Sequence, residues 1–223
     1  MDFDRFAEHY REVLDRTVAI SGEGSEYFAE YKARHVARLL LPGFSGKVLD
    51  FGCGVGLLSS FLKRHLPGCE LHGFDISEAS ISKVDSGLLA QGQFTSRLRD
   101  LAYDYDVIVV ANVMHHIALG DRQMIVHELS GRLCLGGMLT VFEHNPANPL
   151  TRCVVSQCPF DKDAILLRPS ELLTYFAVAN LRFISCDYIV FLPRVFSYLR
   201  ALEPWFSWLP LGAQYAVVGE KNA

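Results

Sequence analysis

The sequence predicts an α/β domain in which a seven-stranded, mostly parallel and doubly wound sheet follows a helical N-terminal cap. From residue 47 onward, apolar runs of strand length alternate with helical patterns, which is typical of a parallel sheet with helices on both faces. The first apolar run, KVLDF, leads into a turn with three glycines. With 223 residues, half of them apolar, the chain can bury one substantial core. We therefore expect a single domain, residues 1–223.

The helical cap comprises residues 1–45. Helical periodicity covers residues 2–16 and 25–41, and Pro42 and Gly43 are strong breakers that end the second segment. The charged and amphipathic start MDFDRFAEHYREVLD does not have the pattern of a secretory signal. The cap is therefore expected to belong to the folded protein.

Residues 46–143 contain the elements expected to carry the ligand site. The predicted strands lie at 47–51, 69–74, 91–95, 105–111 and 137–143, and the predicted helices lie at 56–65, 77–87 and 119–133. In an open parallel sheet, ligands bind beyond the carboxyl ends of the strands, at the point where the strand order reverses. Side chains that directly follow these strands are therefore the site candidates.

The C-terminal part, residues 169–223, completes the sheet. It contains a predicted helix at 169–178 and predicted strands at 181–190 and 213–219. Residues 144–168, which precede it, contain three prolines and are too long for a simple connection in a compact domain. We expect this segment to form a lid.

An apolar insertion, residues 191–212, separates the last two predicted strands. Phe196 and Leu199 share a helical face, and Trp205 follows them. The insertion is expected to wall an apolar pocket or to belong to the core. As a further alternative, its part 191–209 forms an exposed patch for a peripheral membrane contact or a dimer contact.

The glycine turn distinguishes between two kinds of nucleotide-derived ligand. The dinucleotide fingerprint G-x-G-x-x-G matches at Gly52 and Gly54, but Leu57 occupies its third glycine position. Asp50, near the end of the strand, would oppose a pyrophosphate by roughly 4 kcal/mol at contact range with an effective dielectric of about 20. A carboxylate favours a cationic ligand instead, and glycines let the backbone approach it closely. A nucleotide-dependent oxidoreductase is therefore the disfavoured alternative.

The segment VLDFGCGVG resembles the first motif, D/E-x-G-x-G-x-G, of the class I S-adenosylmethionine (SAM)-dependent methyltransferases, which have a Rossmann-like fold. The resemblance extends over roughly residues 45–145. It implies SAM as the methyl donor and S-adenosylhomocysteine as the product. It also implies that Asp50 and the backbone of Gly52 and Gly54 hold the methionine end of SAM, and that Cys53 and Gly56 belong to the same cofactor-binding turn. A non-catalytic module that binds SAM or a partner is an alternative from another class, because a fold does not determine a function.

The same resemblance implies contacts for the nucleoside part of SAM. Asp75, after the second strand, would bind two ribose hydroxyls, and Ile76 would lie against the adenine ring. Ser77 is then available to cap the following helix. Asp100 and Leu101 are similar to the family's adenine-edge contact, although an acid such as Asp100 is also common on a protein surface.

Two further segments hold catalytic candidates. In ANVMHHIALG, Asn112 would flank the methyl donor, and His115 or His116 would act as a general base if the acceptor must lose a proton. Packing against the following helix is the alternative for the histidine pair. In TVFEHNP, Glu143 would either orient a polar acceptor or bind backbone at the entrance of the lid.

The cap offers candidates for closing the pocket. Phe6 and Tyr10 are four residues apart and share a helical face, and His9 lies beside them. Similar methyltransferases fold an N-terminal aromatic residue over the cofactor. Packing of the cap on the sheet would require the same residues, so both roles stay open.

Composition excludes several partners and chemistries. The net charge is −4 with scattered basic residues, so we expect no nucleic acid. The N/D-P-P-Y/F motif of base amino methylation does not occur at 111–114. Cys153, Cys158 and His144 lack the spacing of a four-ligand zinc site, so no metal is expected. Six cysteines without a C-x-x-C pair are typical of a reducing compartment.

The resemblance and the composition together predict a cytoplasmic SAM-dependent methyltransferase. Its acceptor is expected to be an oxygen or nitrogen atom of a small or lipid-like, partly apolar molecule. The negative net charge and the apolar insertion motivate this expectation. A protein or RNA acceptor is the remaining alternative.

Overall fold

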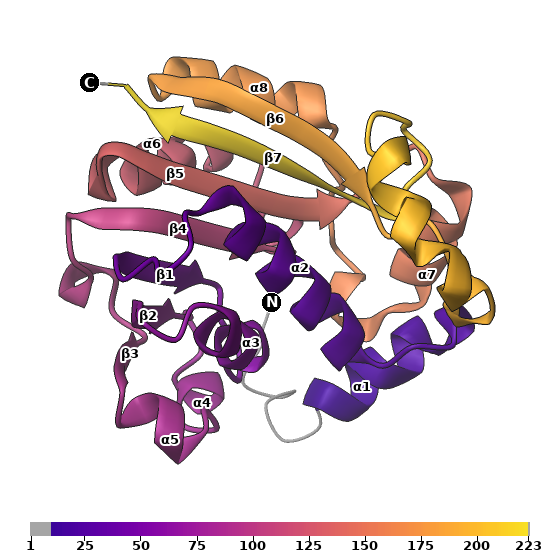
Figure 1. Ribbon diagram of the computed structural model, residues 1–223, viewed down its shortest axis with the longest axis horizontal. Coiled ribbons are helices and arrows are strands. Elements are labelled where there is room, and N and C mark those ends of the chain that lie inside the picture. Colours follow the sequence, from indigo (N-terminus) through magenta and orange to yellow (C-terminus); the bar gives the residue numbers. More distant parts are fainter. Residues whose placement is uncertain (1–9, 223) are drawn as a thin grey trace.

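The computed structural model describes residues 10–222. It contains one seven-stranded sheet with the strand order β3-β2-β1-β4-β5-β7-β6, which confirms the predicted fold class (Figure 1). The strands are β1 Lys47–Phe51, β2 Glu70–Phe74, β3 Gly92–Thr95, β4 Tyr105–Ala111, β5 Leu133–His144, β6 Leu181–Ile189 and β7 Gln214–Lys221. All seven predicted strands are therefore present.

The sheet is parallel from β3 to β5 and antiparallel around β7. Strands β3, β2, β1, β4 and β5 pair in parallel, whereas β7 lies between β5 and β6 and is antiparallel to both. The chain moves outward from β1 to β2 and β3, and then returns to place β4 on the other side of β1. The strand order reverses at this point, so the glycine turn after β1 is at the expected ligand position.

Helices cover both faces of the sheet. On one face lie α2 Ser25–Leu39 and α3 Leu57–His65, and on the other lie α6 Arg122–Arg132 and α8 Pro169–Val178. Successive residues of a strand point to opposite faces. In β1, Val48 packs on the α2 and α3 side, and Leu49 packs on the α6 and α8 side. This alternation places Asp50 on the side of α2 and α3.

Some predicted helix bounds differ from the structure. The pattern at 77–87 forms two short helices, α4 Glu78–Ile81 and α5 Ser86–Leu89, because Ser77 and Asp85 each cap a separate helix start. Helix α6 ends at Arg132, since β5 already begins at the next residue. In the cap, α1 Tyr10–Val18 is the described part of the first helical pattern.

The proline-containing segment at 144–168 forms more regular structure than a loop-like lid would have. It contains the helix α7 Pro149–Gln157 and the 3₁₀ turn η5 Pro159–Asp161. The Asn148 side chain accepts a hydrogen bond from the Thr151 amide at 3.0 Å, and a proline at the first helical position favours the same start. A lid role for this segment stays a prediction.

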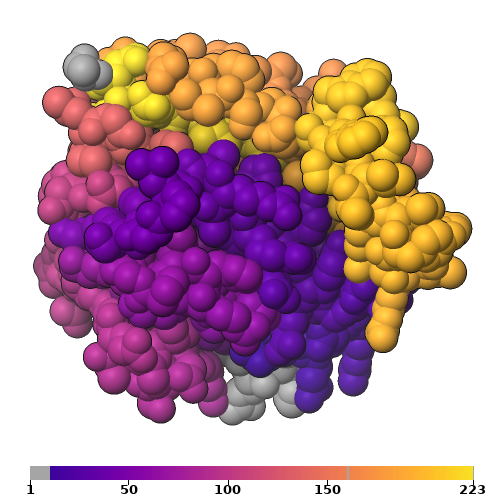
Figure 2. Space-filling model, in the orientation of Figure 1, coloured from indigo at the N-terminus to yellow at the C-terminus, as the bar shows by residue number. Residues whose placement is uncertain are grey.

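The apolar insertion is exposed. Its helical part, η6 Arg194–Phe206, is kinked at Phe196, and it protrudes beside α1 and α7 in Figures 1 and 2. Trp205 is 77% exposed and Trp208 is 71% exposed. Of the three readings of this segment, core packing is therefore wrong for its tryptophans. The insertion is tied to the cap by an ion pair of 2.8 Å between Arg200 and Glu23.

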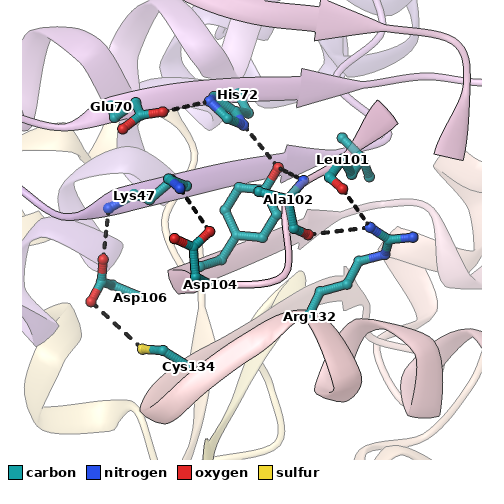
Figure 3. A network of polar contacts seen from close by, with 10 residues as sticks. Lys47, Glu70, His72, Leu101, Ala102, Asp104, Asp106, Arg132 and Cys134 are labelled. Atoms are coloured by element: carbon teal, nitrogen blue, oxygen red, sulfur yellow. Dashed lines mark hydrogen bonds and ion pairs between the residues drawn. The ribbon is translucent and has the colours of Figure 1, made fainter. Parts of the chain in front are cut away.

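The amino ends of the parallel strands carry a polar network far from the glycine turn (Figure 3). The Tyr105 hydroxyl is 2.8 Å from His72 Nδ1 and accepts a hydrogen bond from the Ala102 amide at 3.2 Å. The buried Arg132 guanidinium donates to the Leu101 carbonyl at 3.0 Å. Because these groups satisfy one another, the network stabilises this end of the sheet.

Candidate active site

The glycine turn lies directly after β1. Gly52, Gly54 and Gly56 have φ values of 82°, 54° and 80°, a region that glycine enters without steric cost. A Cβ atom on Gly52 would lie 2.3 Å from Cγ2 of Val113, in the segment that follows β4. Only a glycine therefore lets the turn pass this close to the β4 segment. The Cys53 side chain between the glycines is buried.

Asp50 is buried beside this turn, and we call Asp50 and its buried neighbour Lys32 the floor of the candidate site. The Asp50 side chain is 1% exposed, and Oδ2 accepts a hydrogen bond from the Ser59 hydroxyl of α3 at 2.6 Å. Burial raises the pKa of Asp50 to about 7, although the Ser59 hydrogen bond and the Lys32 charge act in the opposite direction. A cation bound here would therefore strongly favour the ionised carboxylate.

Lys32 is a buried charge, coupled electrostatically to Asp50 and Glu143, that sequence reasoning missed. It lies on α2 and is buried, and its burial lowers its pKa to about 8, while the charges of Glu143 and Asp50 raise it. Its neighbours on the helix face are Ala29, Ala33 and Val36, all buried. A lysine on the apolar stripe of an amphipathic helix is the signal that could have identified it.

Asp75 follows β2 and contacts the glycine turn. Its Oδ2 accepts from the Gly54 amide at 2.8 Å, and its Oδ1 accepts from the Ser77 amide at 2.9 Å. The Ser77 hydroxyl accepts from the Ser80 amide at 3.0 Å, so Ser77 caps α4, as expected. Ile76 is exposed beside Asp75. The structure thus brings Asp75 and Ile76 to the same edge as the turn.

Asp100 and Leu101 have different surroundings. The hydroxyl of Thr95, at the end of β3, donates a hydrogen bond to Asp100 Oδ2 at 3.2 Å, and the Thr95 carbonyl accepts one from the Asp75 amide at 3.3 Å. Asp100 therefore lies near the ribose candidate. Leu101 is 3% exposed and packs in the core with α6 and α8. Its side chain contributes to stability, and an adenine contact remains a prediction for Asp100.

Asn112 has two unusual features at the end of β4. It has a positive φ of 58°, and its amide donates to the Phe142 carbonyl at 2.9 Å. Its side-chain Oδ1 is buried and has no hydrogen-bond partner among residues 10–222. Strain and an unsatisfied buried acceptor both cost free energy, so this position fits a bound ligand that donates a hydrogen bond.

The candidates of the cap lie at or outside the limit of the described chain. Phe6 and His9 lie outside the described residues, and Tyr10 begins α1 without a described side chain. Closure of the pocket by these residues stays a prediction.

His115 and Glu143 form a buried pair at the ends of β4 and β5. His115 Nδ1 lies 2.5 Å from Glu143 Oε2, and the other oxygen, Oε1, accepts from the Met114 amide at 2.8 Å. His115 Nε2 is 3.2 Å from Oδ1 of Asp161 in η5. Burial would lower the pKa of His115, but the two carboxylates outweigh it and raise this pKa to about 9. His115 is therefore poorly suited to act as a base.

Two more imidazoles adjoin this pair. His116 Nε2 is 3.4 Å from Asp161 Oδ1, and the His144 ring centroid is 5.1 Å from that of His115. Burial, reinforced by the charge of His115, lowers the pKa of both His116 and His144 to about 4. The sequence indicated His115, His116 and Glu143 as candidates. It offered no signal for Asp161, which only the fold brings to this cluster.

The fold and the site together define the class. The strand order, the glycine turn at the reversal point and the carboxylates near the end of β1 and just after β2 agree with the pattern of class I SAM-dependent methyltransferases. Residues 49–139 match a family model described as a methyltransferase domain. Residues 49–139 therefore have the sequence of a methyltransferase domain, and the fold is that of the SAM-dependent methyltransferases.

Among particular relatives, the chain is similar to the ribosomal RNA small subunit methyltransferase C of Vibrio vulnificus, with 35% identity over 97 residues. That match covers 41% of this chain and 28% of the relative. It is also similar to a ubiquinone biosynthesis O-methyltransferase of Leptothrix cholodnii, with 29% identity over 147 residues that cover 58% of this chain and 61% of the relative. The chain thus matches less than two thirds of either relative's length.

A solved structure of a SAM-dependent methyltransferase from Archaeoglobus fulgidus has the same fold. It superposes with a TM-score of 0.68 and 16% identity, over 89% of this chain and 95% of that chain. At this level of identity, the likeness concerns the fold alone.

Proposed function

We propose that the protein transfers the methyl group of SAM to an oxygen or nitrogen atom of a small, partly apolar molecule. When bound, SAM supplies a methyl group attached to a positively charged sulfur. The observation that carries the proposal is the pair of buried opposite charges, Asp50 and Lys32, beside the glycine turn. This pair is complementary to the ammonium and carboxylate groups of a methionine moiety.

The residues of the floor fit the cofactor in this way. Asp50 faces the ammonium group and Lys32 the carboxylate, while the glycine backbone allows close approach. Asp75 accepts from the ribose hydroxyls, since a carboxylate has several acceptor sites, and Ile76 and Asp100 contact the adenine. The unsatisfied Asn112 Oδ1 accepts a hydrogen bond from the bound cofactor or acceptor.

The histidine cluster would orient the acceptor. Both nitrogens of His115 already have carboxylate partners, and its side chain is 1% exposed. The role of general base therefore passes to His116, whose pKa is lowered by burial to about 4, so that the ring is unprotonated at neutral pH, and whose side chain is 19% exposed. Glu143, bonded to Met114 and His115, acts as a positioning residue.

The acceptor class is inferred from charge and surface. The net charge of −4 disfavours a polyanion, and one relative is named for ubiquinone biosynthesis. The exposed insertion, defined by residues 191–212, would guide an apolar acceptor, and a membrane surface or a second copy of the chain is its alternative partner. None of the helices within residues 10–222 has the length and apolar character to cross a bilayer. None of the six cysteines, all of which lie within residues 10–222, forms a disulfide, which supports a reducing location such as the cytoplasm.

Binding and turnover assays test the proposal. We expect calorimetry to show binding of SAM and S-adenosylhomocysteine, and a panel of phenols, amines and apolar quinols to include a substrate that turns over. Binding of SAM without turnover on small molecules, but with methylation of ribosomal RNA, would replace the acceptor class by that of the other relative. Binding of NADH in place of SAM would contradict the proposal altogether.

Substitution of His116 tests the acceptor end. We expect His116→Ala to lower kcat by about 10²-fold or more, the usual scale of general-base catalysis, with little change in SAM affinity. The exposed His127 on α6 offers a matched control, and His127→Ala should keep full turnover. Unchanged kcat in His116→Ala would reject a base at this position.

Substitution of Trp205 tests the insertion. Because the side chain is 77% exposed, we expect Trp205→Ser to change the free energy of unfolding by less than about 0.5 kcal/mol. The KM for an apolar acceptor should rise several-fold while kcat is kept. Leu135→Ser, at an exposed position on β5, is the control. Reduced binding to lipid vesicles with an unchanged KM would favour the membrane alternative.

A further inference from the structure

Three chemically suitable donors converge at the predicted acceptor position. His115, His144 and Asp161 each offer one nitrogen or oxygen atom, and these three atoms lie within 4.8 Å of one another. The residues come from three separate elements: the 3₁₀ turn η4 Met114–His116 after β4, the last position of β5, and η5. The fold therefore brings together side chains that are far apart in the sequence.

Two imidazoles and one carboxylate are a common ligand set for transition-metal ions. The same set holds catalytic zinc in some hydrolases and iron(II) in non-haem oxygenases, with further positions open to substrate. In a tetrahedral site with bonds of about 2.0–2.1 Å, neighbouring donor atoms are about 3.3 Å apart. The present donor atoms lie within 4.8 Å of one another. Side-chain rotations that shorten the longer separations by at most about 1.5 Å would therefore bring them to that spacing. We propose that His115, His144 and Asp161 bind one divalent transition-metal ion.

The surroundings of His115 support this assignment. A metal-binding histidine usually gives its second N–H to a carboxylate, which fixes the tautomer and orients the ring. Glu143 occupies that position, since its Oε2 lies 2.5 Å from His115 Nδ1. Glu143 is itself held by the Met114 amide at 2.8 Å. The remaining nitrogen, Nε2, then faces Asp161 at 3.2 Å, so ligand and partner carboxylates lie on opposite sides of one imidazole.

His116 adds a further donor at the same place. Its Nε2 is 3.4 Å from Asp161 Oδ1, and its ring is 4.1 Å from that of His115, centroid to centroid. Of the cysteines considered as zinc ligands, Cys153 is exposed on α7, whereas Cys158, buried just before η5, hydrogen-bonds Asp161 through its side chain. The proposed ligands are two imidazoles and one carboxylate, and the Cys158 thiol lies beside that carboxylate.

The position of the ion narrows the acceptor class. The ligands follow β4 and β5 at the edge of the sheet that carries the glycine turn, so the ion would lie where the acceptor binds. A bound divalent cation holds and acidifies a hydroxyl oxygen, which favours a phenol or another oxygen acceptor over an amine. The preference for an oxygen acceptor rests on the proposed function, whereas the binding of the ion does not.

Metal titration of the tag-free protein, stripped with a chelator, tests the site directly. With Co²⁺ as the probe, we expect visible absorption bands that saturate at one ion per chain, and displacement by Zn²⁺. His144→Ala and Asp161→Asn should each weaken Co²⁺ binding at least tenfold, and Glu143→Gln should weaken it about 10- to 100-fold. His127→Ala, on the exposed face of α6, is the matched control and should bind like the parent.

The outcomes separate the two proposals. Absence of Co²⁺ bands in the parent protein, or equal binding in the parent, His144→Ala and Asp161→Asn, would overturn the site. Asp161→Asn, which is isosteric, keeps the test valid if His144→Ala does not fold. Full methyl transfer after chelation would overturn the acceptor role of the ion. A protein that binds Co²⁺ but not SAM would contradict the proposed function and leave the metal site standing.

Discussion

Replacing Lys32 with methionine should weaken the binding of SAM by roughly 10- to 150-fold, equivalent to the 1.5–3 kcal/mol of a hydrogen bond to a charged group. Lys32 is buried on α2 beside Asp50, so its ammonium group is the cation available to the carboxylate of the methionine moiety. Methionine keeps most of the side-chain volume and removes only the charge. Isothermal titration calorimetry with SAM and S-adenosylhomocysteine measures the change.

Asp50→Asn and Asp75→Ala provide the complementary variants, and we expect losses of similar size. Lys83→Met, at an exposed position, should leave the affinity unchanged. Unaltered affinity in both folded Lys32→Met and Asp50→Asn proteins would disprove the complementary-charge model of the floor.

The pH dependence of SAM affinity sharpens this test. Burial raises the pKa of Asp50 to about 7, so below that pH a proton competes with the ligand's ammonium group for the carboxylate. Affinity should therefore fall as the pH decreases through about 7. Asp50→Asn should remove this acid limb. The stability of the ligand-free protein should depend on pH in the opposite direction. Because the folded state raises the pKa of Asp50, ionisation of this carboxyl is costly there, and the free energy of unfolding should fall as the pH rises from 3.8 toward 7.

Replacing Glu143 with leucine should lower the free energy of unfolding by about 3–5 kcal/mol, because it leaves buried polar groups without their partner. Glu143 is fully buried, with its oxygens bonded to the Met114 amide and to His115. Glu143→Gln keeps an acceptor for one of these donors and should lose less. Denaturant unfolding measures both changes.

The exposed ion pair between Glu220 and Arg182, at 2.9 Å, is the matched control. Because solvent screens exposed pairs, Glu220→Gln should cost no more than about 1 kcal/mol. A loss of under about 1 kcal/mol in Glu143→Leu as well would show that the pair at the ends of β4 and β5 is not a structural element.

Much of the fold was predictable because its information is local. Strand and helix periods indicated all seven strands and the main helices, and the KVLDF run with its glycines located the ligand turn. The prediction of a single helix at 77–87 was wrong, because Ser77 and Asp85 each cap the start of a separate short helix. The helical period alone does not show whether the chain continues one helix or starts a second. The exposure of Trp205 could not be predicted, since an apolar helical face has the same pattern in a core, a pocket wall or a surface patch.

The candidate site was predictable where residues lie at, or just after, the carboxyl ends of strands. Asp50, Asp75, Asn112 and Glu143 all lie at the ligand edge of the sheet, because parallel strands bring their carboxyl ends to one side. Leu101 was assigned to the adenine by motif order, but its side chain packs in the core.

From the sequence alone came the α/β class, the sheet, the glycine turn and the preference of Asp50 for a cation, since each depends on residues that are neighbours along the chain. Only the tertiary structure brought Lys32 of the cap to Asp50, and Asp161 of η5 to His115 and His144. These groups are separated by long stretches of chain. Their electrostatic interactions depend on distances in space, which local periodicity does not contain.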